Sequence, residues 1–211
     1  MRLGIWKCAP RMEQGIGNDG SIYLFCAAFA RYLLINFTHP VFLELNAGTC
    51  FVVCRWIGKQ LIFFAWLVLQ NRIWTADRLQ RRGWQNCGNC PLCNQVQESS
   101  GHLLYKCHFT IRSWKEILTW CGCHDIALAQ WVNEASVEAW WTKLALDHGV
   151  ARKAMSSLLM LISWKVLNER NARVFRNVVS SVAIVVSRIK KEARAWCLAG
   201  AKFLGNVIPG E

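Results

Sequence analysis

The feature that most constrains the fold of this chain is a cysteine-rich run near its middle, CGNCPLCNQVQESSGHLLYKC at residues 87–107. Within the run, Cys90, Cys93, His102 and Cys107 form the pattern C-x2-C-x8-H-x4-C. A C-x2-C turn lets two thiolates reach one ion at about 2.3 Å each, and three thiolates with one imidazole suit tetrahedral, borderline-soft zinc. Four protein ligands leave no open coordination position. We therefore predict one structural Zn²⁺ rather than a catalytic metal.

Two neighbours compete for places in this ligand set. Cys87 and Cys90 are also spaced C-x2-C, and His108 directly follows Cys107. We prefer the pair Cys90 and Cys93 because it encloses a Pro-Leu turn, but either neighbour could replace a ligand.

The cysteine count indicates a reducing compartment. Eleven cysteines cannot form a complete set of internal disulfides. The first sixteen residues carry several charges and no apolar core of a secretory signal. The apolar stretch 22–37 is short for a membrane span and is interrupted by Arg31. We expect an intracellular protein, nuclear or cytoplasmic, with free thiols, a metal site and no transmembrane helix.

Hydrophobic periodicity predicts a mainly α-helical chain from residue 61 onward. Thr75 is a candidate N-cap and Gly83 a candidate stop for one short helix, and Ser99 or Ser100 can cap another. The β-branched start at 182–186 lowers the helix propensity of the last segment. The predicted helices span 61–73, 76–82, 102–106, 111–120, 137–149, 151–175 and 182–201.

These signals divide the chain into three parts. Residues 1–60 show no clean period, although local runs such as 49–57 could form a strand. Residues 61–125 form the predicted zinc-binding module with its CCHC ligand set. Residues 126–211 form a helical C-terminal region.

The positive charge favours a polyanionic partner. The formal net charge is +12, which suits RNA or DNA, although a solvated basic surface has the same composition. Trp84 could stack on a base or simply pack against the zinc loop. The candidate phosphate contacts flank the metal ligands and are Arg72, Arg78, Arg81, Arg82, Lys106 and Arg112.

The sequence does not favour an enzyme. The 13 acidic residues are dispersed, without the Tyr-x-Asp-Asp pair of a polymerase or the carboxylate cluster of a two-metal nuclease. Cys121, Cys123 and His124 lie close in sequence, but they have no second half that would complete a metal site. Asp125 next to His124 gives a pair without a third catalytic partner. We expect no catalytic residues and no small-molecule substrate.

Several motifs in order resemble one known family. These motifs are the FFAWL helix at 63–67, the segment R-x-x-T-x-D-x-L-x-x-R-G at 72–83, CPLC at 90–93, HLLYKC at 102–107 and SWKVLNERNARVFRN at 163–177. In this order they resemble the zinc-binding region found C-terminal to the reverse transcriptase of plant LINE-type, non-LTR retroelements. The resemblance covers about residues 61–205. It implies the same four zinc ligands in a small helical module that assists template or RNA handling.

The chain departs from that family in its first part. IWKCAP at 5–10 is similar to the family's lead-in, which normally runs almost directly into the FFAWL helix. Here residues 11–60 separate the two, and we interpret them as an insert of rearranged or non-coding origin. Two functions remain open: a nucleic-acid-binding zinc module, or a structural or protein-interaction domain in which zinc only stabilises the fold.

Overall fold

The computed structural model describes residues 59–83, 85–146, 152–198 and 200–209, which fall within one compact unit of residues 40–211. The strand candidate at 49–57, the proposed insert up to residue 58 and the helix stop at Gly149 lie outside these residues.

The prediction of a mainly α-helical fold is confirmed, and the described residues form no β-strand. A single antiparallel bridge joins Asn89 to Gln97. The α-helices of the described residues are α4 (Lys59–Leu69), α5 (Ala76–Arg81), α6 (His108–Trp120), α7 (Val137–Leu146), α8 (Arg152–Arg176), α9 (Val182–Leu198) and α10 (Lys202–Gly205). Two short turns, which the sequence did not distinguish from α-helix or loop, are the π-helical η3 (His102–Lys106) and the 3-10 helical η4 (Leu128–Asn133).

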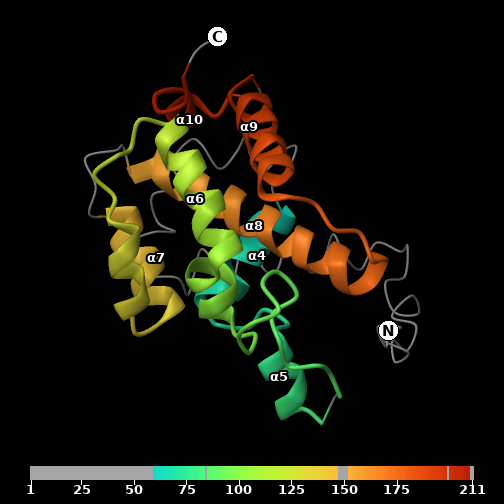
Figure 1. Ribbon diagram of the computed structural model, residues 1–211. Helices are drawn as coiled ribbons and strands as arrows, with labels where there is room; N and C mark the ends of the chain where they lie inside the picture. The colour runs from blue at the N-terminus through green and yellow to red at the C-terminus, as the bar shows by residue number, and fades with distance from the viewer. Residues whose placement is uncertain (1–58, 84, 147–151, 199, 210–211) are drawn as a thin grey trace. The chain divides into compact units, whose positions relative to one another are not determined.

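Helix α8 is the centre of the bundle. It contacts α4, α7, α9, α10 and η3, and Figure 1 shows it crossing the middle of the helices. Its predicted apolar stripe is buried at Met155, Leu158, Leu159, Ile162 and Val166, and Leu167 is half-buried.

Helix α9 forms despite its β-branched start. Val185 and Val186 are buried in the bundle, as are Ile189, Ala193 and Trp196 further along the helix. Burying these side chains outweighs the small loss in helix propensity of the valines.

Many of the tryptophans belong to the core. The Trp114 ring meets Trp131 and Trp140 edge to face, with centroids 5.4 and 5.9 Å apart. Tyr105 stacks on Trp140 at 4.7 Å, and Trp141 meets Trp140 at right angles. These five rings join η3, α6, η4 and α7, so they pack elements together rather than offer faces to a ligand.

The connection from α4 to α5 differs from its prediction in two details. Helix α4 ends at Leu69 rather than at residue 73, because Asn71 adopts a left-handed conformation with φ 51°. Thr75 does occupy the N-cap position of α5, but its hydroxyl donates to the Asp77 carboxylate instead of accepting a backbone N–H. The first N–H of the helix, that of Ala76, donates to the side chain of Glu98 at 2.8 Å.

Gly83 ends α5, as the sequence predicts, with φ +80°. Because a side chain in the left-handed region is strained, we expect Gly83→Ala to lower the free energy of unfolding by about 1 kcal/mol in urea titrations. Gly205→Ala is the matched control, since an added Cβ there makes only ordinary contact with Cys197 Sγ at 3.9 Å, without a positive φ. Equal effects of the two substitutions would contradict the strain at Gly83.

None of the helices in the described parts of the chain combines the length and apolar character needed to cross a membrane.

Candidate metal centre

The fold brings the four predicted ligands together. The ligand atoms of Cys90, Cys93, His102 and Cys107 all lie within 4.8 Å of one another. Cys90 Sγ is 4.0 Å from Cys107 Sγ, and Cys93 Sγ is 3.3 Å from His102 Nε2. Two sulfurs bound tetrahedrally at 2.3 Å to one zinc would lie about 3.8 Å apart, so this spacing fits a single ion.

The first two ligands sit on a tight hairpin. Cys90 N donates to Val96 O and Glu98 N donates to Gly88 O, both at 2.8 Å, which closes residues 88–98 into a loop. At its tip Asn94 has φ 56° and donates its N–H to Cys90 O. Backbone N–H groups of Leu92 and Cys93 turn toward the Cys90 sulfur. Such amide donors stabilise a thiolate, and hence a metal ligand.

The last two ligands depend on the π-helical turn η3. Residues five apart in an α-helix point about 140° away from each other, so H-x4-C on an α-helix would not converge. Here Cys107 N donates to His102 O at 2.7 Å, an i→i+5 bond that widens the turn by one residue. That extra residue returns Cys107 to the face of His102. The serine cap predicted for this turn is Ser99, whose hydroxyl accepts the N–H of His102 at 3.2 Å.

Cys107 has a second role as the N-cap of α6. The backbone N–H groups of Phe109 and Thr110 point at its sulfur, so the helix begins at His108, earlier than the predicted 111. The hydrogen bond from the Cys90 thiol, helped by His102 and these two amides, lowers the pKa of Cys107 to about 4 despite burial. The same contact and burial raise the pKa of Cys90 above its usual range. One ligand is therefore poised as a thiolate, and metal binding displaces the proton of its neighbour.

Among the residues that the structure describes, the other cysteines and histidines stay outside this group. Cys87 and His108 are exposed, and neither belongs to the four-residue cluster. Burial raises the pKa of Cys121 to about 12 and also raises that of Cys123, and neither thiol belongs to the four-residue cluster. His124 is exposed, and in the described residues it joins no metal-binding group.

Residues 44–114 match the family model described as zinc-binding in reverse transcriptase. No curated protein and no solved structure matches the chain. The matched family is an accessory zinc-binding domain and is not itself catalytic. Together with the ligand geometry, the match assigns one zinc ion to Cys90, Cys93, His102 and Cys107. The match begins before residue 61 and ends within α6, so α7 to α10 lie beyond it.

The zinc-binding loop is tied to α8 by a buried ion pair. Arg170 Nη2 lies 2.7 Å from Glu98 Oε1 and its Nε lies 3.0 Å from Glu98 Oε2. The side chains of Arg170 and Glu98 are only 5% and 0% exposed. Because Glu98 also accepts the N–H of Ala76, this one carboxylate joins the zinc loop, α5 and α8.

Arg173, one turn further along α8, holds the C-P-L-C turn itself. Its Nη1 donates to the carbonyls of Pro91 and Leu92, both at 3.1 Å. Its Nη2 donates to Ser180 O at 2.9 Å, and its guanidinium lies 4.7 Å from the Phe109 ring. The ERNAR part of the 163–177 motif therefore acts on the zinc loop, a role that its sequence position did not indicate.

The predicted phosphate contacts occupy different environments. Arg72, Arg81, Arg82 and Arg112 are exposed. Arg78 is half-buried and donates to Asn71 O. Lys106 is half-buried and donates to Glu134 O at 3.4 Å, and Trp84 lies outside the described residues.

The structure adds two aromatic residues that the sequence did not single out. The Arg72 guanidinium lies 5.7 Å from the Trp66 ring, and that of Arg82 lies 4.5 Å from the Trp74 ring. Trp74 is 48% exposed, unlike the tryptophans of the core. Trp74 lies in the connection between α4 and α5, and that position was the one sign in the sequence that this tryptophan is a surface residue.

Proposed function

We propose that this chain is a non-catalytic zinc-binding protein that binds RNA or DNA through a basic surface beside its structural zinc. We further propose that it derives from a plant LINE-type, non-LTR retroelement, on the strength of the motif order at 61–177. Its place would be inside the cell, nuclear or cytoplasmic. We expect no membrane association and no small-molecule substrate.

The observation that carries the proposal is the pair of arginine–tryptophan stacks at the α4–α5 connection. Arg72 over Trp66 and Arg82 over Trp74 place two exposed cations on aromatic faces. Cations of this kind attract phosphates, and an exposed indole can stack on an unpaired base. Trp74 thus offers a stacking surface to a single strand, and Arg82 offers a neighbouring charge.

The zinc loop supports this surface directly. The hydroxyl of Ser100 donates to Asn71 Oδ1 at the turn that carries Arg72. Glu98 accepts the first N–H of α5, the helix that precedes Arg82. These hydrogen bonds connect the zinc-binding loop to the segment that carries the arginines, which is the physical reason to expect that zinc and nucleic-acid binding are coupled.

The test is binding of a 20-nucleotide RNA and a 20-base-pair DNA to the zinc-loaded full chain, by fluorescence anisotropy across 50–300 mM salt. We expect the double variant Arg72→Gln/Arg82→Gln to flatten the slope of log affinity against log salt by about 1.4 for the single strand and about 1.8 for the duplex. Lys143→Gln controls for the loss of one exposed cation elsewhere, on α7, where Lys143 pairs with Glu134, and the effects are compared per charge removed.

Two results would overturn the proposal. One is the absence of salt-dependent binding by the wild-type chain. The other is an equal effect of the α7 control and the double variant. Either result would favour the alternative, a structural or protein-interaction module in which zinc only stabilises the fold.

A further inference from the structure

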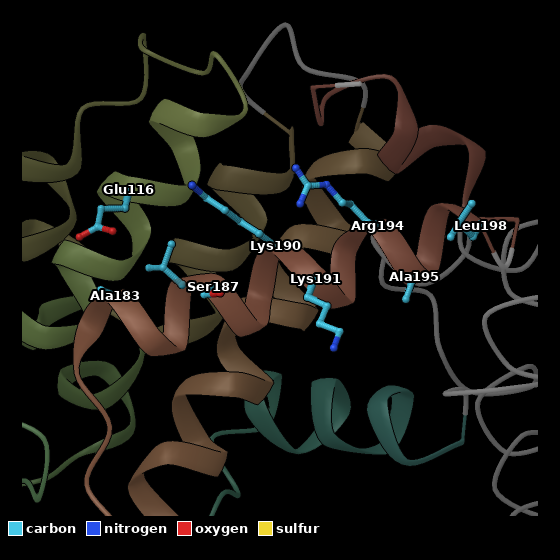
Figure 2. Close-up of a pocket in the computed structure, with 9 residues that line it drawn as sticks. Glu116, Ala183, Ser187, Lys190, Lys191, Arg194, Ala195 and Leu198 are labelled. Carbon is cyan, nitrogen blue, oxygen red and sulfur yellow. The ribbon is translucent and has the colours of Figure 1, made fainter. Parts of the chain in front are cut away.

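A groove lies on the surface formed by α6 and α9, away from the zinc ligands. It has a volume of about 750 Å³, and Figure 2 shows its lining side chains. Most of them recur every three or four residues along the outer side of α9, so they form one helical stripe. The lining comprises Glu116 of α6 and Ala183, Val186, Ser187, Lys190, Lys191, Arg194, Ala195 and Leu198 of α9.

The stripe carries unbalanced positive charge. Among the described residues, no carboxylate lies within ion-pair distance of Lys190, Lys191 or Arg194. Glu116 lines the groove opposite them, while the nearest acid on α9 itself, Glu192, is engaged by Lys165 at 3.1 Å. Like charges three and four residues apart on one helix face repel each other, and a bound polyanion would relieve that repulsion.

Trp120 orients two of these cations. Lys190 Nζ lies 5.4 Å and the Arg194 guanidinium 5.7 Å from its ring. In Figure 2 Lys190 and Arg194 extend along one side of α9 and Lys191 extends along the other. Cation–aromatic contact restricts the motion of long side chains, so less entropy is lost when they bind an anion.

The floor of the groove is made of small side chains. The short side chains of Ala183, Ser187 and Ala195 form a depression in the helix surface between the cations. The helix rises about 6 Å from Lys190 to Arg194, which is close to twice the axial rise of about 3.4 Å per phosphate in one strand of a duplex. The small side chains leave room for a phosphate backbone, and the spacing of the cations matches the spacing of its charges.

We propose that this groove is a second nucleic-acid contact, which binds the phosphodiester backbone of a strand through Lys190, Lys191 and Arg194. The inference rests on the proposed function and extends it to a surface in the helical region beyond the zinc-binding match. Phosphate contact alone carries no sequence information, so the groove adds affinity and orients the strand.

An anionic membrane fits the same surface less well. A helix that lies in a bilayer needs a broad exposed apolar face beside its basic residues. The apolar side of α9, with Val185, Ile189 and Trp196, is buried in the bundle. The exposed apolar residues Ile184 and Leu198 stand at opposite ends of the helix.

The experiment compares Lys190→Gln/Lys191→Gln/Arg194→Gln and the single variant Glu116→Gln with the wild-type full chain, all loaded with zinc. We expect the triple variant to weaken binding of the 20-nucleotide RNA about tenfold or more and to flatten its salt slope by about 2. Glu116→Gln removes the acid of the groove and is expected to tighten binding a few-fold. Unchanged zinc content and melting temperature would exclude misfolding, and the loss of affinity per charge removed is compared with that of Lys143→Gln.

The outcomes separate this inference from the proposed function. Loss of binding in Arg72→Gln/Arg82→Gln but not in the groove variants would overturn the groove and leave the zinc-proximal surface. No oligonucleotide binding by the wild-type chain would overturn both. Charge-dependent binding to phosphatidylserine vesicles in preference to RNA would overturn the groove as a nucleic-acid contact.

Discussion

Replacing Cys90 by serine is expected to release the zinc and to produce the largest loss of stability of any single substitution in the chain. Cys90 is fully buried, and its sulfur is 4.0 Å from that of Cys107. Structural zinc supplies on the order of 10 kcal/mol in small zinc domains, which is comparable with the whole stability of a typical protein. The measurement is zinc per chain by elemental mass spectrometry, together with thermal unfolding.

The disruption should begin in the zinc-binding loop and spread to its neighbours. Residues 85–120 hold the ligands, η3 and α6, and the serine variant should lose hydrogen-exchange protection there first. Helices α7 to α10 lie outside this region and carry buried apolar residues of their own, so part of the helical circular dichroism should remain. A variant that keeps one zinc per chain would contradict the ligand assignment.

Cys123→Ser is the matched control for this substitution. Cys123 is also a buried thiol, but it lies after α6 and outside the ligand group. We expect it to keep the zinc and to change the melting temperature little. Equal loss of zinc from Cys90→Ser and Cys123→Ser would refute the assignment of the four ligands.

The second large effect is expected at the ion pair between the zinc loop and α8. Arg170→Met keeps the length of the side chain but leaves the Glu98 carboxylate buried without its cation. Removing one partner of a buried pair typically destabilises by about 3–5 kcal/mol. We expect a loss of that size in urea unfolding, because Glu98 is fully buried and its remaining partner is a single backbone N–H.

Arg81→Met is the control, because Arg81 forms an ion pair of the same N–O distance that is exposed to solvent rather than buried. Arg81 Nη2 is 2.7 Å from Asp77 Oδ2, as close as Arg170 is to Glu98, but the Arg81 side chain is 69% exposed. An exposed i,i+4 pair contributes about 0.3–0.5 kcal/mol. The double variant Glu98→Gln/Arg170→Met should recover part of the loss, since it also removes the buried charge. A loss below about 1 kcal/mol for Arg170→Met would show that the pair is not buried in solution.

The helices could be predicted because their signals are local. The apolar stripe of α8, the glycine that ends α5 and the serine before His102 act within a few residues of the chain. The four zinc ligands were predictable for a similar reason, since C-x2-C and H-x4-C are short-range spacings with a chemical meaning. To bring the two ligand pairs together, the polar stretch 94–101 only has to lead the chain back from Cys93 to His102.

The local features that the sequence did not predict correctly depend on residues that are distant along the chain. Thr75 occupies the expected cap position, but the cap is made by Glu98, whose approach no local pattern records. The widened turn at η3 is fixed by the requirement that His102 and Cys107 face the same point. Helix α4 stops at Leu69 because Asn71 turns toward Ser100 of the zinc loop.

The sequence by itself predicted the metal, a preferred set of four ligands and a mainly helical chain, because ligand spacing and apolar periodicity are local patterns. Only the tertiary structure decided what Arg170 and Arg173 do and which tryptophans are core and which are surface. It alone placed Lys190 and Arg194 against Trp120 beside a groove. These properties come from contacts between helices and loops that are distant in sequence. Which side chains are buried, and which charged groups pair, depends on how those elements pack.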